Sequence, residues 1–158
     1  MPVVALRPVE DGDLDALFEQ QRDPEAVRMA AFTAPDPNDR AAFDAHQARV
    51  RNLPDVTHRA VTCDGQLVGS IASFPIEGET EITYWIDRAA WGRGIATQAV
   101  ALLLDLVPTR PLYARAASDN AGSLRVLHKS GFRDIGTEVS FATARNEEIE
   151  ETILRLDR

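Results

Sequence analysis

Hydrophobic positions along the chain follow two patterns, one typical of strands and one typical of helices. Residues 3–9 form a short apolar run and predict a first strand. A helix is predicted to begin at residues 11–13, because Leu14 and Leu17 recur at helical spacing. A second helix is predicted over residues 39–50, after a break that contains two prolines. Two helices are therefore expected before the main sheet.

Three strand-like segments come next. Residues 58–63 and 66–74 are separated by Asp64 and Gly65, a dipeptide that favours a two-residue hairpin turn. After a second turn, residues 81–87 alternate in polarity. One face of this segment carries Ile82, Tyr84 and Ile86, and the other carries Glu81, Thr83 and Trp85. We expect three antiparallel strands in succession.

The second half of the chain predicts helices and strands in turn. Residues 96–106 are nearly all apolar and predict a helix that packs on the sheet, and residues 112–117 predict a fifth strand. Asn120 caps a further helix, and segments 132–142 and 149–156 close the chain as a hairpin. The pattern predicts an α/β (α+β) fold, with one mixed, mostly antiparallel twisted sheet of about six or seven strands and about four helices.

Length and composition indicate one globular domain over residues 1–158. Of the 158 residues, 44% are hydrophobic and 27% charged, and neither a linker nor a repeat divides the chain. The sequence predicts no membrane span and no signal peptide, so we expect a cytoplasmic protein. A net charge of -8 argues against a nucleic-acid partner. Cys63 is the only cysteine and the three histidines are scattered, so no metal site is predicted.

The most informative segment is the loop at residues 91–97, between the fourth strand and the apolar helix. Gly92 and Gly94 remove side chains there, which lets backbone N–H groups converge on a phosphate at a helix start. A tight turn explains a lone pair of glycines equally well. No Gly-Lys-Ser/Thr sequence occurs, which argues against a Walker A loop. A dinucleotide loop fits less well, because Thr97 replaces a third glycine, although Asp119 keeps that alternative open.

Several motifs, in the same order, resemble the GCN5-related N-acetyltransferase (GNAT) superfamily. The resemblance covers essentially the whole chain and rests on residues 84–87, 91–97, 120–123 and 131–132. Within the superfamily the chain looks most like the ribosomal-protein N-terminal acetyltransferases (RimJ/RimL type), in which residues 23–25 also have a counterpart. Trp91 stands where the superfamily usually has Gln or Arg, and an aromatic residue is frequent there in this branch.

The resemblance implies that acetyl-CoA binds as the acyl donor. Amides of the loop would hold its pyrophosphate, and the end of the fourth strand would flank its pantetheine arm. Asn120 would touch this arm as well as cap its helix, and Lys129 would reach the nucleotide, although a solvated helix face also explains that lysine. The cofactor-binding residues so implied are Trp85, Ile86, Asp87, Gly92, Arg93, Gly94, Ile95, Ala96, Thr97, Asn120, Ser123 and Lys129.

Acetyl transfer to an amine needs a base, an oxyanion site and a donor to the leaving thiolate. Glu81 is our candidate base, acting through water, and an exposed strand glutamate is the alternative. Amides near Trp85 and Ile86 would bind the acetyl oxygen if the strand carries the bulge of the family. Ser123 is the candidate donor to sulfur, because Leu127 occupies the position of the tyrosine acid of many relatives. The missing tyrosine also favours a second reading, a non-catalytic module that binds or senses acyl-CoA.

The acceptor is less well defined by the sequence. A primary amine is expected, either a small molecule or a peptide N-terminus, and no nucleic acid or membrane partner is predicted. Arg28, Phe32 and His58 are the candidate substrate-binding residues. A homodimer through the C-terminal hairpin is consistent with the sequence.

Overall fold

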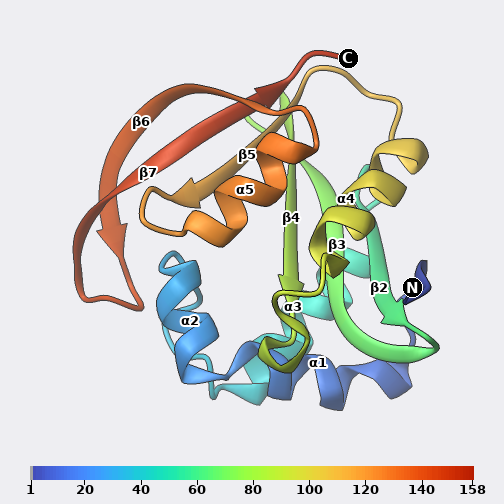
Figure 1. Ribbon diagram of the computed structural model, residues 1–158. Coiled ribbons are helices and arrows are strands. Elements are labelled where there is room, and N and C mark those ends of the chain that lie inside the picture. The colour runs from blue at the N-terminus through green and yellow to red at the C-terminus, as the bar shows by residue number, and fades with distance from the viewer. Residues whose placement is uncertain (1) are drawn as a thin grey trace.

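A computed structural model describes residues 2–158, which form one seven-stranded sheet with helices on both faces (Figure 1). The strands are β1 Val4–Pro8, β2 Thr57–Cys63, β3 Gln66–Ile76, β4 Glu79–Ile86, β5 Leu112–Ala117, β6 Arg133–Ala142 and β7 Glu147–Leu156. The α-helices are α1 Leu14–Gln21, α2 Pro24–Ala30, α3 Arg40–Arg51, α4 Ile95–Leu106 and α5 Ala121–Lys129. Two short 3-10 helices, η1 Asp11–Asp13 and η2 Arg88–Ala90, precede α1 and follow β4.

The predicted mixed sheet is confirmed, and its strand order is β1-β2-β3-β4-β5-β7-β6. Every neighbouring pair is antiparallel except β4 and β5, which are parallel. The pairing of β4 with β5 is limited to one register position, Glu81 opposite Tyr113. Beyond this point the two strands diverge and leave a gap in the middle of the sheet (Figure 1).

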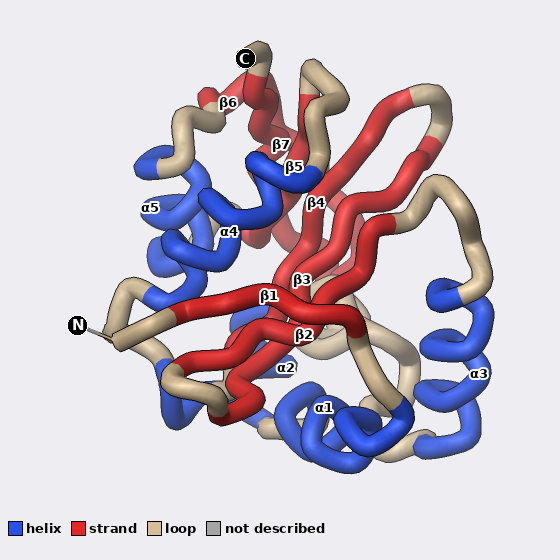
Figure 2. Tube along the Cα trace, turned by 90° about the vertical axis from the view of Figure 1, so that its right-hand side faces the viewer, coloured by secondary structure: helices blue, strands red, loops and turns tan. Residues whose placement is uncertain are grey.

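Two layers of apolar packing hold the sheet. Figure 2 shows α4 and α5 on one face, with α1 and α3 on the other. The larger core lies under α4 and α5 and includes the fully buried Val100, Leu103 and Leu154. The smaller core lies under α1 and α3, where Leu17 packs beside Ala60. The larger core fixes one face of β4, because Ile82 and Ile86 are buried in it.

The structure contains one α-helix more than the sequence pattern predicts. This helix, α2, begins at Pro24, and the Asp23 carboxylate caps it by accepting a hydrogen bond of 2.9 Å from the Ala26 amide. An acidic cap followed by proline is a common helix start, although seven residues are too few to show a hydrophobic period. None of the helices within residues 2–158 is both long and apolar enough to cross a membrane.

Candidate active site

A cavity of about 520 Å³ lies where the gap between β4 and β5 meets α4, α5 and α2. Ten of the twelve residues predicted to bind the cofactor line it: Trp85, Ile86, Gly92, Gly94, Ile95, Ala96, Thr97, Asn120, Ser123 and Lys129. Residues from three separate stretches of the chain, 85–86, 92–97 and 120–129, therefore meet at one site. The cavity also borders α2, through Ala26, Met29 and Ala30, whereas the predicted Arg28 of this helix does not line it.

One end of the cavity is the start of α4. Gly94 is the N-cap of this helix with φ 75°, and Gly92 also has a positive φ of 79°. No side chain caps the helix, whose first hydrogen bond runs from the Gln98 amide to the Gly94 carbonyl. The amides of residues 95–97 therefore have no intrahelical acceptor, and all three residues line the cavity. Uncapped amides at the positive end of a twelve-residue helix suit an anionic group such as phosphate.

The loop before α4 is attached to the end of β4. The Trp91 indole N–H donates a hydrogen bond of 2.8 Å to the carbonyl of Ile86, which ties the loop to the strand. The Trp91 side chain, 43% exposed, forms part of the cavity wall. Basic side chains from α5, Arg125 and Lys129, lie on the opposite wall. This end of the cavity therefore combines free amides with positive charge.

The middle of the cavity contains a polar network between β4, α5 and α2. The Tyr84 hydroxyl lies 2.7 Å from the Ser123 hydroxyl oxygen. The Asn120 side chain caps α5 by accepting a hydrogen bond of 3.2 Å from the Ser123 amide, as predicted. Its amide nitrogen donates to the carbonyl of Met29 in α2, at 3.3 Å. Tyr84 was not among the predicted site residues, because its place on the apolar face of β4 is equally typical of a core tyrosine.

Backbone amides of β4 face the gap beside this network. The Asp87 amide donates to the Val68 carbonyl of β3, at 2.7 Å. Because N–H groups alternate in direction along a strand, the amides of Ile86 and Tyr84 point to the opposite edge, where β5 diverges. The pairing of β3 with β4 is continuous from Gly69 opposite Ile86 to Ile76 opposite Glu79. The bulge on which the expected oxyanion site depended does not interrupt this pairing. The divergence of β5, rather than a bulge, leaves these amides without a strand partner.

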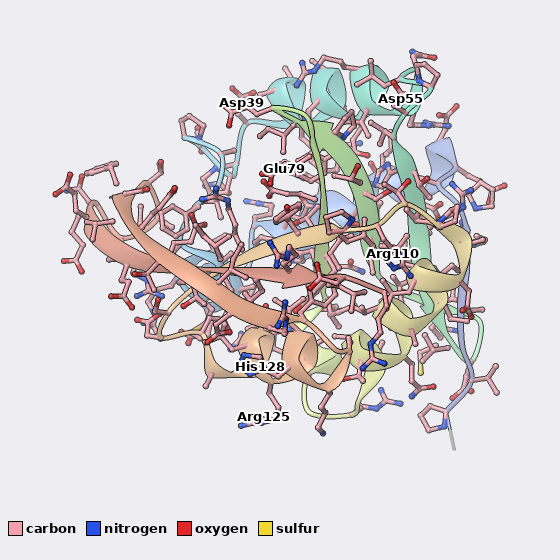
Figure 3. The ribbon with its side chains drawn as sticks, turned by 90° about the horizontal axis from the view of Figure 1, so that it is seen from above. Asp39, Asp55, Glu79, Arg110, Arg125 and His128 are labelled. Carbon is pink, nitrogen blue, oxygen red and sulfur yellow. The ribbon has the colours of Figure 1, made fainter. Side chains whose placement is uncertain are left out.

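Glu81 lies outside the cavity lining, on the opposite face of β4 from Tyr84. Its carboxylate is 3.6 Å from the Arg115 guanidinium, which also binds Glu138 at 2.8 Å and Glu151 at 3.2 Å. Burial raises the pKa of Glu81, and the nearby charge of Arg115 only partly offsets this shift. Glu79, at the start of the same strand, lies on the α3 side of the sheet, whereas Arg125 of α5 lies on the other side (Figure 3).

The remaining predicted residues also lie outside the cavity lining. The Arg93 guanidinium is 3.8 Å from the Cys63 sulfur, and Asp87 caps η2. Arg28 forms an ion pair of 2.9 Å with Glu25 on the surface of α2. Phe32 packs against a small cluster of buried alanines, and His58 is half-buried in β2. Burial lowers the pKa of His58.

Comparison with known proteins identifies the family to which this chain belongs. A family model described as an acetyltransferase (GNAT) domain matches residues 4–133, which is most of the chain. The chain belongs to the GNAT family. This membership confirms the family predicted from the loop motifs and the class of enzyme, an acyl-CoA-dependent acetyltransferase. Within residues 2–158, no group of three or more His, Cys, Asp or Glu side chains is arranged to hold a metal ion.

Individual relatives agree with the GNAT assignment. The probable N-acetyltransferase YjcK of Bacillus subtilis (strain 168) is 36% identical over 81 residues. That alignment covers 46% of this chain and 45% of YjcK, so the match spans less than half of each protein. Among solved structures, Mycobacterium smegmatis RimJ in complex with CoA-disulfide has a TM-score of 0.80 at 22% identity, covering 99% of this chain and 86% of RimJ. Spermidine N-acetyltransferase from Vibrio cholerae, in complex with CoA and spermine, has a TM-score of 0.79 at 17% identity, covering 96% and 95%. At these identities the two structures confirm the fold.

Proposed function

We propose that this GNAT protein transfers an acetyl group from acetyl-CoA to a primary amine by direct attack within a ternary complex. The observation that carries the proposal is the single cavity that joins the uncapped start of α4, the Ser123 hydroxyl and α2. This cavity places a site that suits the donor's phosphates beside a hydroxyl that can donate to the leaving thiolate. The RimJ and spermidine acetyltransferase structures, both of which contain CoA or its disulfide, support this reading.

The donor would lie along the cavity with its pyrophosphate at the start of α4. The free amides of residues 95–97 and the turn at Gly92 fit this group, and Lys129 would reach the nucleotide. The pantetheine arm would pass between β4 and α5, beside Ile86 and Asn120. We retain Asp87 and Arg93 as more distant contributors, acting by holding the loop rather than by lining the cavity.

The thioester would then lie beside the gap in the sheet. The free amide of Ile86 is our candidate for the oxyanion site, because it faces the gap at the end of β4. The amine nitrogen attacks the thioester carbon, the C–S bond breaks and its electron pair passes to sulfur. Ser123 would donate a hydrogen bond to this thiolate. Glu81 would accept the amine proton through water across the gap, and its raised pKa makes it a stronger base than an ordinary glutamate.

The acceptor would approach from the face of the sheet that carries Glu81. Three carboxylates surround the one guanidinium of Arg115 there, which leaves a negative field that attracts an ammonium group. Arg28 and Phe32, on and after α2, remain our candidate acceptor contacts. His58 lies in β2, two strands away from β4 in the sheet, and is the most distant candidate. A small-molecule amine and a peptide N-terminus both fit this charge pattern.

Free thiol released from acetyl-CoA in the presence of a panel of amines tests the proposal. We expect amine-dependent release, and we expect the Ser123→Ala variant to lower the rate with little change in acetyl-CoA affinity. Ser130→Ala is the matched control, since Ser130 is in the C-cap of the same helix and bonds only the Val126 carbonyl. Binding of acetyl-CoA without thiol release by any amine would favour the sensing module. An unchanged rate for Ser123→Ala would contradict the role of that serine.

The C-terminal hairpin remains our candidate for a homodimer contact. Its edge strand β6 exposes Ile135, Val139 and Phe141, with exposed fractions of 45%, 67% and 56%. An exposed apolar edge strand can pair with a second copy of the same strand. Light scattering of the purified protein tests this prediction, and a monomer at high concentration would contradict it.

A further inference from the structure

We infer that Tyr84 is a positioning residue that orients the Ser123 hydroxyl toward the thiol group of the donor. This inference rests on the proposed function. Two facts carry it: the 2.7 Å separation of the two hydroxyl oxygens and the place of both residues on the cavity wall. The α5 helix itself offers no tyrosine, so the hydroxyl comes instead from the neighbouring strand.

Either hydroxyl could donate across this contact, and we infer that Tyr84 is the donor from the two distances. The Tyr84 oxygen is also 3.3 Å from the Ser123 carbonyl oxygen. This contact is longer, and the carbonyl already accepts a backbone hydrogen bond within α5. The shorter contact, to the Ser123 hydroxyl oxygen, has the ideal length of an O–H···O bond. If Tyr84 donates there, Ser123 keeps its own proton for another acceptor. Within residues 2–158, the Ser123 hydroxyl forms no other hydrogen bond, so its proton is free for a group in the cavity.

The surroundings keep the Tyr84 hydroxyl protonated, and therefore able to donate. Its ring packs against the main core, and burial raises the pKa of its hydroxyl. A phenol with a raised pKa stays protonated at neutral pH and does not become the acceptor of the pair as a tyrosinate. Hydrogen bonds in a chain polarise one another, so donation from Tyr84 strengthens donation by Ser123.

The backbone of Ser123 is fixed by the same network. The Asn120 carboxamide holds the Ser123 amide and the Met29 carbonyl, so α5 and α2 are joined at this point. Tyr84 then joins β4 to the same serine. The serine is therefore held by its backbone and by its side chain from two different elements. During transfer, Tyr84 keeps its proton and Ser123 donates a hydrogen bond to the thiolate, which takes up a proton from water after release.

A double-mutant cycle tests the inference in the full-length protein. Tyr84→Phe removes one oxygen and keeps the ring, so it should lower kcat about five- to tenfold, with the KM for acetyl-CoA changed less than about twofold. Combining it with Ser123→Ala should cost no more than Ser123→Ala alone, because Tyr84 acts through the serine. Tyr113→Phe is the matched control: Tyr113 is the other tyrosine of the chain and does not line the cavity. Additive losses, or an unchanged kcat for Tyr84→Phe, would overturn the inference.

A binding measurement separates this inference from the proposed function. CoA and desulfo-CoA, which lacks the sulfur, are titrated at pH 9, where part of the CoA is thiolate. We expect wild-type protein to prefer CoA by about three- to tenfold, as one hydrogen bond to a charged atom provides, and Tyr84→Phe to lose most of this preference. If the preference is present but no amine is acetylated, only the proposed transfer fails. If Tyr84→Phe keeps the preference, or wild type shows none, Tyr84 does not orient a donor to sulfur.

Discussion

A close approach of β3 to the backbone of β4 at Gly69 predicts a strong effect of one added methyl group. Gly69 in β3 lies opposite Ile86 of β4, and Ile86 lines the cavity. A Cβ atom placed on Gly69 would be 2.0 Å from the Trp85 carbonyl oxygen and 3.1 Å from the Ile86 Cα. An ordinary contact needs more than 3 Å, and both neighbours are backbone atoms that no rotamer change can move. The Gly69→Ala variant must therefore shift β4 by about 1 Å relative to β3.

Overpacking of this kind typically costs 1–3 kcal/mol, and backbone neighbours place Gly69→Ala at about 3 kcal/mol. For a domain of this size such a loss lowers Tm by roughly 6–12 °C. Circular dichroism during heating measures the shift, with Gly12→Ala as the matched control, since a Cβ there would meet nothing within 4 Å. We expect the control to change Tm by less than about 3 °C. A Gly69→Ala protein that melts within about 2 °C of wild type would refute the reasoning.

Two further predictions concern charge. Burial raises the pKa of Glu81, and a base works only when ionised, so the transfer rate should fall as pH decreases through a value above 4.5. Glu81→Gln should abolish this acidic limb of the pH–rate profile, and an identical limb in the variant would exclude Glu81 as the base. Arg145, with a side chain 11% exposed, binds the Asp119 carboxylate and donates to the Arg28 carbonyl at 2.8 Å. Arg145→Met should therefore lower the free energy of unfolding, measured in urea, by about 1–2 kcal/mol. The control is Arg133→Met, at an exposed ion pair, which should cost less than about 0.5 kcal/mol. Equal losses in the two variants would contradict this reasoning.

Local sequence was the basis of the prediction for the phosphate end of the proposed site. Gly92 and Gly94 have positive φ, and an apolar helix without a capping side chain follows them directly in the chain. Their conformations depend on neighbouring residues, so the uncapped helix start at residues 91–97 could be predicted from local sequence, and the resemblance to the GNAT superfamily added the phosphate ligand. The alternation of β4 and the cap at Asn120 follow from equally short-range patterns, and both are confirmed.

The proposed catalytic centre depends on contacts between distant segments. Tyr84 and Ser123 are 39 positions apart in the sequence, and no periodicity could show that their hydroxyl groups meet. Helix α2 was also missed, because its seven residues carry too little pattern, and its place at the cavity comes from packing.

The sequence by itself therefore determined the fold class through its hydrophobic period and the family through its ordered motifs, and it predicted the uncapped start of α4 from backbone preferences over a few residues. The tertiary structure decided the rest. The order of the sheet places β5 beside β4, and their divergence after Glu81 opens the gap and frees the strand amides. The packing of α5 on this sheet brings Ser123 to Tyr84. These features arise from the packing of whole elements, in which each side chain depends on neighbours that the chain supplies from elsewhere.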